Sequence, residues 1–141
     1  MIGCSETANS KYAGIYVWNP TSSKLVEEKS DVDKNDFNKI ISEIIKRNTN
    51  CINENTKVLD VKVTDKVAYI NLSEEFNDSN TNSSTAAIYK INSIVYELCL
   101  NNPAQIDGVR FLIEGKMQEA IGPVSTDVPL SSTIDQQTNL S

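Results

Sequence analysis

Hydrophobic side chains recur at helical spacing in two stretches of this chain. Over residues 36–48 the apolar positions follow an i, i+3, i+4, i+7, i+8 pattern, which places them on one helix face: Phe37, Ile40, Ile41, Ile44 and Ile45. Over residues 84–101 a similar stripe is wider: Ile88, Ile91, Val95 and Leu98, with Ala87, Ile94 and Cys99 beside them. Pro103 follows the second stretch and cannot continue a helix. The pattern predicts two amphipathic helices.

A period of two residues marks the predicted strands. β-Branched and aromatic side chains fill residues 12–18, which end at Asn19-Pro20, and residues 24–30 follow as a partner strand. A hairpin is expected over residues 57–72, with its tight turn at Asp65-Lys66. Its first arm alternates apolar Leu59, Val61 and Val63 with polar residues, so one face is apolar and the other wet. Residues 108–114 form a last strand, and residues 119–130 an edge segment at most.

The predicted order is therefore β-β-α-β-β-α-β, an α+β fold. Because each helix has one apolar stripe and each strand one apolar face, we expect two helices packed on one face of a mixed sheet. The domain would span residues 11–130. Residues 1–10 are predicted to be a polar tether, and residues 131–141 a disordered tail.

Composition and charge narrow the possible functions. The 141 residues carry a net charge of −6 and are 39% hydrophobic. No stretch combines clustered Lys and Arg with aromatic residues, which argues against nucleic-acid binding. An acidic surface is repelled by anionic headgroups, and no apolar run approaches 18 residues. Contact with a membrane is therefore expected only through a lipid anchor.

The candidate residues for catalysis are few, because the chain has no histidine. The adjacent carboxylate pairs Glu27-Glu28 and Glu74-Glu75 would point to opposite faces of an extended chain, so they do not converge on a substrate. We therefore expect no enzymatic activity and no cofactor.

Metal and disulfide chemistry is not predicted either. The acidic run at Asp31, Asp33, Asn35 and Asp36 lacks the Gly and Glu positions of an EF-hand loop and suits the capping of the first helix better. Three cysteines, Cys4, Cys51 and Cys99, fit no CxxC pattern. We expect no bond between Cys51 and Cys99, and a place in the core for Cys99.

Cys4 is the one cysteine with a candidate function. The order Ile2-Gly3-Cys4-Ser5 resembles the end of a lipoprotein signal, in which the Cys receives the lipid. The alternative is an incidental cysteine at the start of the chain. The polar stretch that follows is suited to a linker between a membrane and a domain.

A row of aromatic side chains is the second candidate site. Tyr12, Tyr16 and Trp18 share one face of their strand by period-two counting, while Ile15 and Val17 share the other. The Ile/Val face is the natural partner of the helices. The row then lies on the open side of the sheet, where Tyr69 would extend it, and exposed aromatic rows often bind partners. Alternatively, the segment at residues 123–130 covers the row.

The order of elements and several local sequences resemble the GerMN domain family. The likeness lies in the aromatic strand at residues 12–18, in Leu72-Ser73-Glu74-Glu75-Phe76, and in the strand and closing glycine at residues 109–115. Pro129-Leu130 is similar to the terminal Pro-Leu of the family. The chain departs from the family pattern at Lys29 and Asp31 and at residues 52–56, which concerns the loops and any partner contact through them.

The resemblance implies an extracytoplasmic domain, often lipid-anchored, of spore-forming and related bacteria. It also implies a fold similar to the ring-building motif of sporulation channel proteins, roles in envelope assembly, and no defining catalytic residues. We therefore expect a non-catalytic binding or assembly module of sporulation or germination. Its partners would be envelope or sporulation proteins, self-association included. The alternative is a module that binds peptidoglycan, with the aromatic row stacking on sugars.

Overall fold

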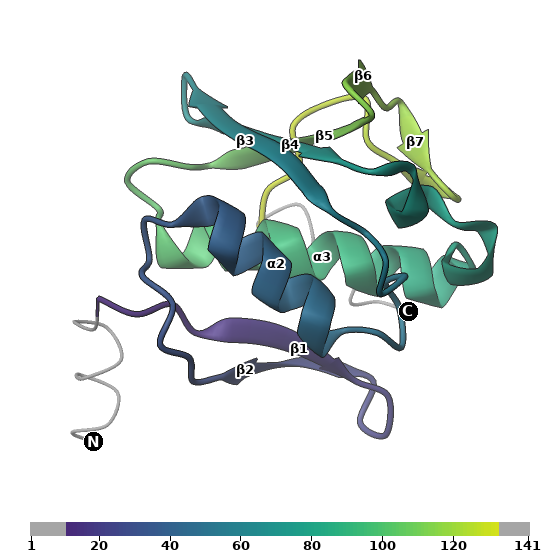
Figure 1. Ribbon diagram of the computed structural model, residues 1–141, viewed down its shortest axis with the longest axis horizontal. Helices are drawn as coiled ribbons and strands as arrows, with labels where there is room; N and C mark the ends of the chain where they lie inside the picture. Colours follow the sequence, from purple (N-terminus) through teal and green to yellow (C-terminus); the bar gives the residue numbers. More distant parts are fainter. Residues whose placement is uncertain (1–10, 133–141) are drawn as a thin grey trace.

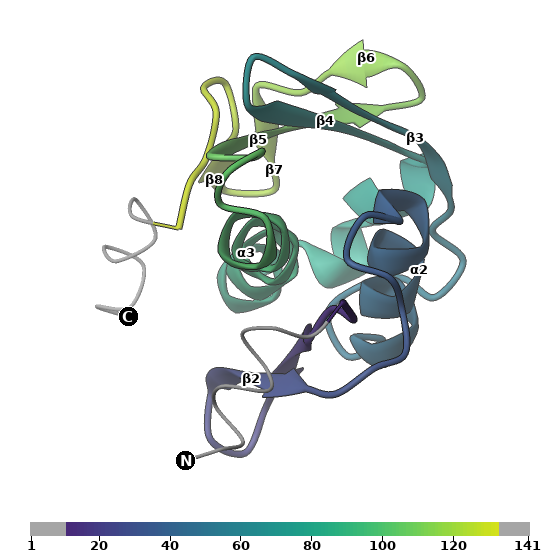
Figure 2. The same ribbon diagram turned by 90° about the vertical axis from the view of Figure 1, so that its left-hand side faces the viewer.

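Two helices lie between two separate sheets in this protein (Figures 1 and 2). A computed structural model describes residues 11–132. One sheet has four strands in the order β3-β4-β5-β6, namely Val58–Thr64, Val67–Leu72, Gly108–Ile113 and Lys116–Met117. It is mixed, because β4 runs antiparallel to β3 and parallel to β5. On the other side of the helices lies the antiparallel hairpin of β1, Ile15–Asn19, and β2, Lys24–Glu28.

Both helices begin and end close to the predicted residues. Helix α2 spans Phe37–Arg47, and its N-cap Asp36 accepts a hydrogen bond from Lys39 N. Helix α3 spans Ser84–Asn101, and the hydroxyl of its N-cap Ser83 accepts one from Ala86 N. These side-chain oxygens satisfy backbone N–H groups that have no partner inside the helix.

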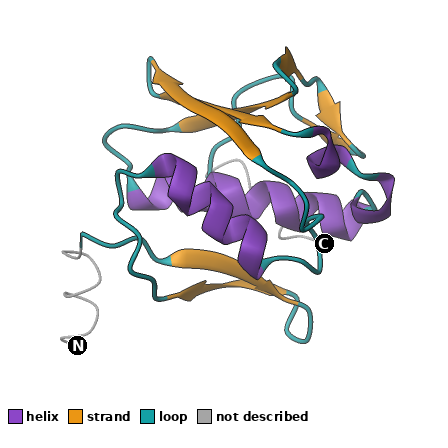
Figure 3. Ribbon diagram, in the orientation of Figure 1, coloured by secondary structure: helices purple, strands orange, loops and turns teal. Residues whose placement is uncertain are grey.

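Short elements complete the described part of the chain (Figure 3). Two 3₁₀ turns, η1 at Glu74–Asn77 and η2 at Ser79–Thr81, connect β4 to α3. Strands β7, Ala120–Ile121, and β8, Val124–Ser125, form a small hairpin. Beyond it, Leu130 pairs with Val109 at the edge of β5.

The core fills the space between the four-stranded sheet and the helices. Ile40 and Ile44 of α2 and Ile91 and Ile94 of α3 are buried, as predicted from the two stripes. The sheet contributes the alternate positions that face the helices: Ala68, Ile70, Leu72, Val109, Phe111 and Ile113. The helices therefore cover one face of the mixed sheet, which confirms the predicted α+β class and order of elements.

Two details differ from the sequence prediction. The first hairpin forms a sheet of its own, on the far side of the helices. Leu59 is 45% exposed and does not join the apolar face of β3, because the register shifts between Val58 and Asp60. Such a bulge adds one residue to a strand, so the period-two count fails there. The predicted tether at residues 1–10 and most of the predicted tail lie outside the described residues.

Candidate functional site

The aromatic side chains of β1 attach the first hairpin to α3. The Tyr16 ring meets Tyr96 edge to face, with ring centroids 6.1 Å apart and an interplanar angle of 78°. Trp18 stacks on Tyr89 at 4.7 Å and 9°. Such pairs contribute about 0.5–1.5 kcal/mol beyond burial. The open aromatic row predicted from the sequence is therefore not formed, and helix α3, rather than the segment at residues 123–130, packs on Tyr16 and Trp18.

Tyr12 and Tyr69 lie apart from this packing. Tyr12 precedes β1, is 42% exposed and pairs with Asp33. Tyr69 belongs to β4, in the four-stranded sheet, with the helices between it and β1 (Figure 1). The expected extension of one patch by Tyr69 is therefore wrong, because the two strands belong to different sheets. One face of the Trp18 ring is also occupied by Tyr89 and is not free to stack on a sugar.

Four polar side chains bind the backbone along the free edge of β1. Glu97 Oε1 accepts from Tyr16 N at 2.9 Å, and Asn48 Oδ1 accepts from Trp18 N at 2.8 Å. Amide groups donate to the carbonyls of this edge: Asn48 to Tyr16 O, Asn50 to Trp18 O and Asn101 to Gly14 O. An unpaired strand edge is a template for pairing with another chain. These contacts satisfy that edge and hold the hairpin across both helices.

Glu97 is fully buried, which is costly for a carboxylate. Its second oxygen accepts from Asn101 Nδ2 at 2.6 Å. Burial raises the pKa of Glu97 to about 8; the Tyr16 N–H and Arg47 oppose this effect, and Glu27 adds to it. Because both oxygens of Glu97 are engaged inside the protein, the carboxyl fixes the hairpin and does not face a substrate.

Lys90 performs a similar task at the other end of α3. It is fully buried, and its ammonium donates to Phe76 O at 2.6 Å and to Thr81 Oγ1 at 3.0 Å. It also lies 5.0 Å from the centroid of the Phe76 ring. Burial lowers the pKa of Lys90 to about 8, while Cys51 and Asp78 act in the opposite direction. Lys90 thus ties both 3₁₀ turns to α3.

The Leu72–Phe76 sequence that carries part of the family resemblance leads into this contact. Phe76 is fully buried and stacks on Phe111 at 5.7 Å, with an angle of 14°. Ser73 N donates to Lys57 O, and Ser73 Oγ accepts from Lys57 N. These interactions explain why a small polar residue and an aromatic one occur at this spacing, and they are structural.

Sequence reasoning missed both Lys90 and Glu97. A signal was present: the two charged residues lie next to Ile91 and Leu98, in a helix whose apolar residues are not confined to one narrow stripe. A charge in such a place is buried only when it is hydrogen-bonded.

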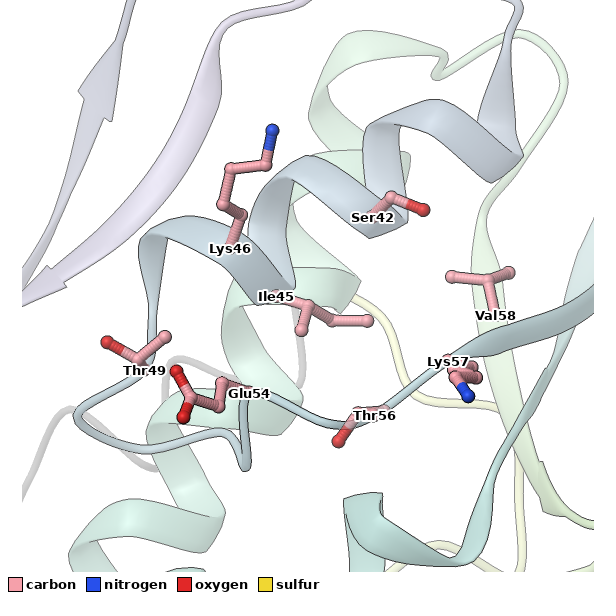
Figure 4. Close-up of a pocket in the computed structure, with 8 residues that line it drawn as sticks. All are labelled: Ser42, Ile45, Lys46, Thr49, Glu54, Thr56, Lys57 and Val58. Carbon is pink, nitrogen blue, oxygen red and sulfur yellow. The ribbon is translucent and has the colours of Figure 1, made fainter.

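A pocket of about 570 Å³ lies between α2 and the chain leading into β3 (Figure 4). Its lining includes Ile45 and Val58 together with Lys46, Glu54 and Lys57. The charged ends do not converge: Lys46 projects from α2 away from Glu54 and Lys57. This arrangement brings no acid and base together, and residues 11–132 contain no cluster of three or more His, Cys, Asp or Glu side chains that could hold a metal.

The cysteines occupy different environments. Cys4 lies outside the described residues. Cys51 is fully buried, and burial raises the pKa of its thiol to about 12, so it is unreactive at neutral pH. Cys99 is 6% exposed and belongs to the core, as predicted.

The outer face of the four-stranded sheet is left uncovered by the helices (Figure 2). Tyr69 lies on it, paired in register with Lys62 of β3 on one side and Arg110 of β5 on the other. Lys62 is exposed, and Tyr69 and Arg110 are half-buried. No described helix is long and apolar enough to cross a bilayer.

These features define a small α+β domain whose elements are held together by buried, hydrogen-bonded polar side chains, and which has one open sheet face. The chain belongs to the family described as "Germane: Sporulation and spore germination", which matches residues 14–119. It is therefore a GerMN-like domain, as the resemblance in the sequence predicted.

Solved structures share the fold. The first GerMN domain of the sporulation protein GerM from Bacillus subtilis is 17% identical with a TM-score of 0.62, and the match covers 85% of this chain and 98% of that one. The tandem GerMN domains of the same protein give 18% and 0.60, covering 85% of this chain and 44% of that one. A candidate lipoprotein from Clostridium perfringens gives 17% and 0.59, covering 78% and 77%. No curated protein matches the sequence.

Proposed function

We propose that this chain is a non-catalytic binding or assembly module that works at the cell envelope during sporulation or germination. The observation that carries the proposal is the family match over residues 14–119. The geometry supports it, because the buried charges Glu97 and Lys90 hold the domain together. The polar groups of the pocket also point apart.

Two observations support a place of action at the membrane surface: the Ile2-Gly3-Cys4-Ser5 sequence and the candidate lipoprotein with the same fold. A lipid on Cys4 would hold the domain at the outer surface of a membrane, and the polar residues after it would act as the linker. Labelling of growing cells with an alkyne-bearing fatty acid tests this. Label on the wild-type protein and none on Cys4→Ala is the expected result. A membrane-bound, unlabelled wild-type protein would refute the anchor.

Partner binding is tested by crosslinking in sporulating cells. A photoreactive amino acid at Asn71, on the open sheet face beside Tyr69, is expected to capture an envelope protein. The same group at Lys24, on the exposed end of β2, serves as the matched control. Capture from neither position, with the protein present and folded, would contradict a role in assembly.

A further inference from the structure

The open sheet face carries a cation–aromatic row made of Lys62, Tyr69 and Arg110. The three residues lie in register on β3, β4 and β5, so their side chains project from the same face. Adjacent strands are about 4.8 Å apart, which places the Cα atoms of Lys62 and Arg110 about 10 Å apart with Tyr69 between them. This Cα spacing is set by the backbone of the sheet, and the Arg110 guanidinium is in addition held by Thr126, just after β8.

The two cations are available to a ligand. Within the described part of the chain, the basic residues that form ion pairs are Lys46 and Arg47, and neither Lys62 nor Arg110 forms one. Arg110 Nε donates to Thr126 O at 3.0 Å, which fixes its stem and leaves the terminal nitrogens of the guanidinium for a carboxylate. The chain has a net charge of −6, so two basic side chains without an acidic partner in residues 11–132, on either side of an aromatic ring, form a local site for a negatively charged group.

The neighbouring rows limit what can bind. On one side lie Asp60, Asn71 and Leu112, and on the other Thr64, Val67 and Gly108. Asp60 would repel further negative charge, and the chain as a whole repels polyanions. Phosphate polymers and anionic membranes, which need many cations, are therefore poor ligands. Leu112 and Val67 offer half-buried apolar surface next to Tyr69.

We propose that the cation–aromatic row binds an acidic, extended peptide segment of a partner protein. Side chains four residues apart lie on the same face of an extended chain and about 13 Å apart, and the long side chains of Lys62 and Arg110, whose Cα atoms are about 10 Å apart, can reach two carboxylates at that spacing. An apolar residue between them would pack on the Tyr69 ring. This inference rests on the proposed function, because it names the chemistry of the partner.

The test uses the full chain and a short fluorescein-labelled peptide with two glutamates four positions apart and a leucine midway between them. Fluorescence anisotropy at low salt is expected to show weak binding that falls as salt is added. Lys62→Gln should weaken binding about threefold and Arg110→Gln about fivefold, since each removes one partly exposed ion pair. The matched control Lys24→Gln, on the hairpin at the other side of the molecule, should leave binding unchanged. Because Arg110 also contacts Thr126, thermal melts check its fold, and Lys62→Gln provides an independent result.

Several results would overturn the inference. They are equal binding of a peptide with glutamine in place of glutamate, equal binding by all the variants, and binding of polyphosphate or phosphatidylglycerol vesicles in place of the peptide. If the peptide fails while crosslinking from Asn71 still captures an envelope protein, the acidic-segment proposal is wrong and the assembly role stands. If crosslinking fails as well, both are wrong.

Discussion

Replacing Glu97 by glutamine is expected to flatten the dependence of folding stability on pH between pH 5 and pH 8. The pKa of Glu97 is raised from 4.5 to about 8 in the folded protein. The folded state therefore holds this proton more tightly than the unfolded chain does. The stability that the protonated Glu97 contributes is fully present below pH 4.5 and is lost as the pH rises toward 8.

The magnitude follows from the pKa difference. One pKa unit corresponds to 1.36 kcal/mol, so ionising Glu97 across this window should cost about 3–4 kcal/mol. The chain has no histidine, so no other side chain with an ordinary pKa titrates between pH 5 and pH 8. Glutamine cannot ionise. It keeps an acceptor for Tyr16 N but meets Asn101 Nδ2 with a second donor, which costs about 1 kcal/mol relative to the neutral carboxyl group. The variant should therefore be less stable than wild type near pH 5 and more stable near pH 8.

Urea denaturation followed by tryptophan fluorescence is the assay. Trp18 is the only tryptophan and lies where the hairpin meets α3, so it reports directly on this contact. Glu54→Gln, at an exposed carboxylate, is the control and should keep the wild-type slope. The two hydrogen bonds that Glu97 accepts favour its ionised form, whereas burial favours the neutral one. Parallel pH profiles for wild type and Glu97→Gln would show that the hydrogen bonds prevail, and would refute the reasoning.

Two further predictions concern α3. Burial lowers the pKa of Lys90 from 10.5 to about 8, so folding stability should rise by about 2–3 kcal/mol between pH 8 and pH 10.5, as Lys90 loses its proton in the unfolded chain as well. The Lys90→Met variant should lack this rise when urea denaturation is followed by circular dichroism. An equal rise in both proteins would contradict the prediction. A double-mutant cycle on Trp18→Ala and Tyr89→Ala should give a coupling energy of about 0.5–1.5 kcal/mol by the same method, and additive effects would show that the stacked rings do not interact.

Local patterns in the sequence predicted the elements well. The stripe with Ile40 and Ile44 fixed α2, and Pro103 limited α3. Asp65 and Lys66 both have positive φ, as a two-residue hairpin turn requires, although neither is Gly or Asn. These signals are local, because they depend on side chains a few residues apart.

The sequence could not place the first hairpin. Period-two counting gave β1 two faces, and it assumed that all strands share one sheet. In the structure the free edge of β1 faces the helices, and its groups bind Asn48 and Glu97, residues 30 and 81 positions away from their partners. Contacts between positions this far apart leave no period in a sequence, so the packing of Tyr16 and Trp18 on α3 was missed.

The buried polar residues explain how a family resemblance can be specific without marking a reactive site. Lys90 binds Phe76 O, and Glu97 binds Tyr16 N, so the Leu72–Phe76 sequence and the aromatic strand are each tied to one charged residue of α3. Removing one member of such a pair leaves the other buried and unsatisfied, which is more costly than losing the hydrogen bond alone. The Leu72–Phe76 sequence and the aromatic strand therefore both stabilise the fold. The surface that we propose for a partner is the outer face of the sheet, where Lys62 and Arg110 have no ion pair among the described residues.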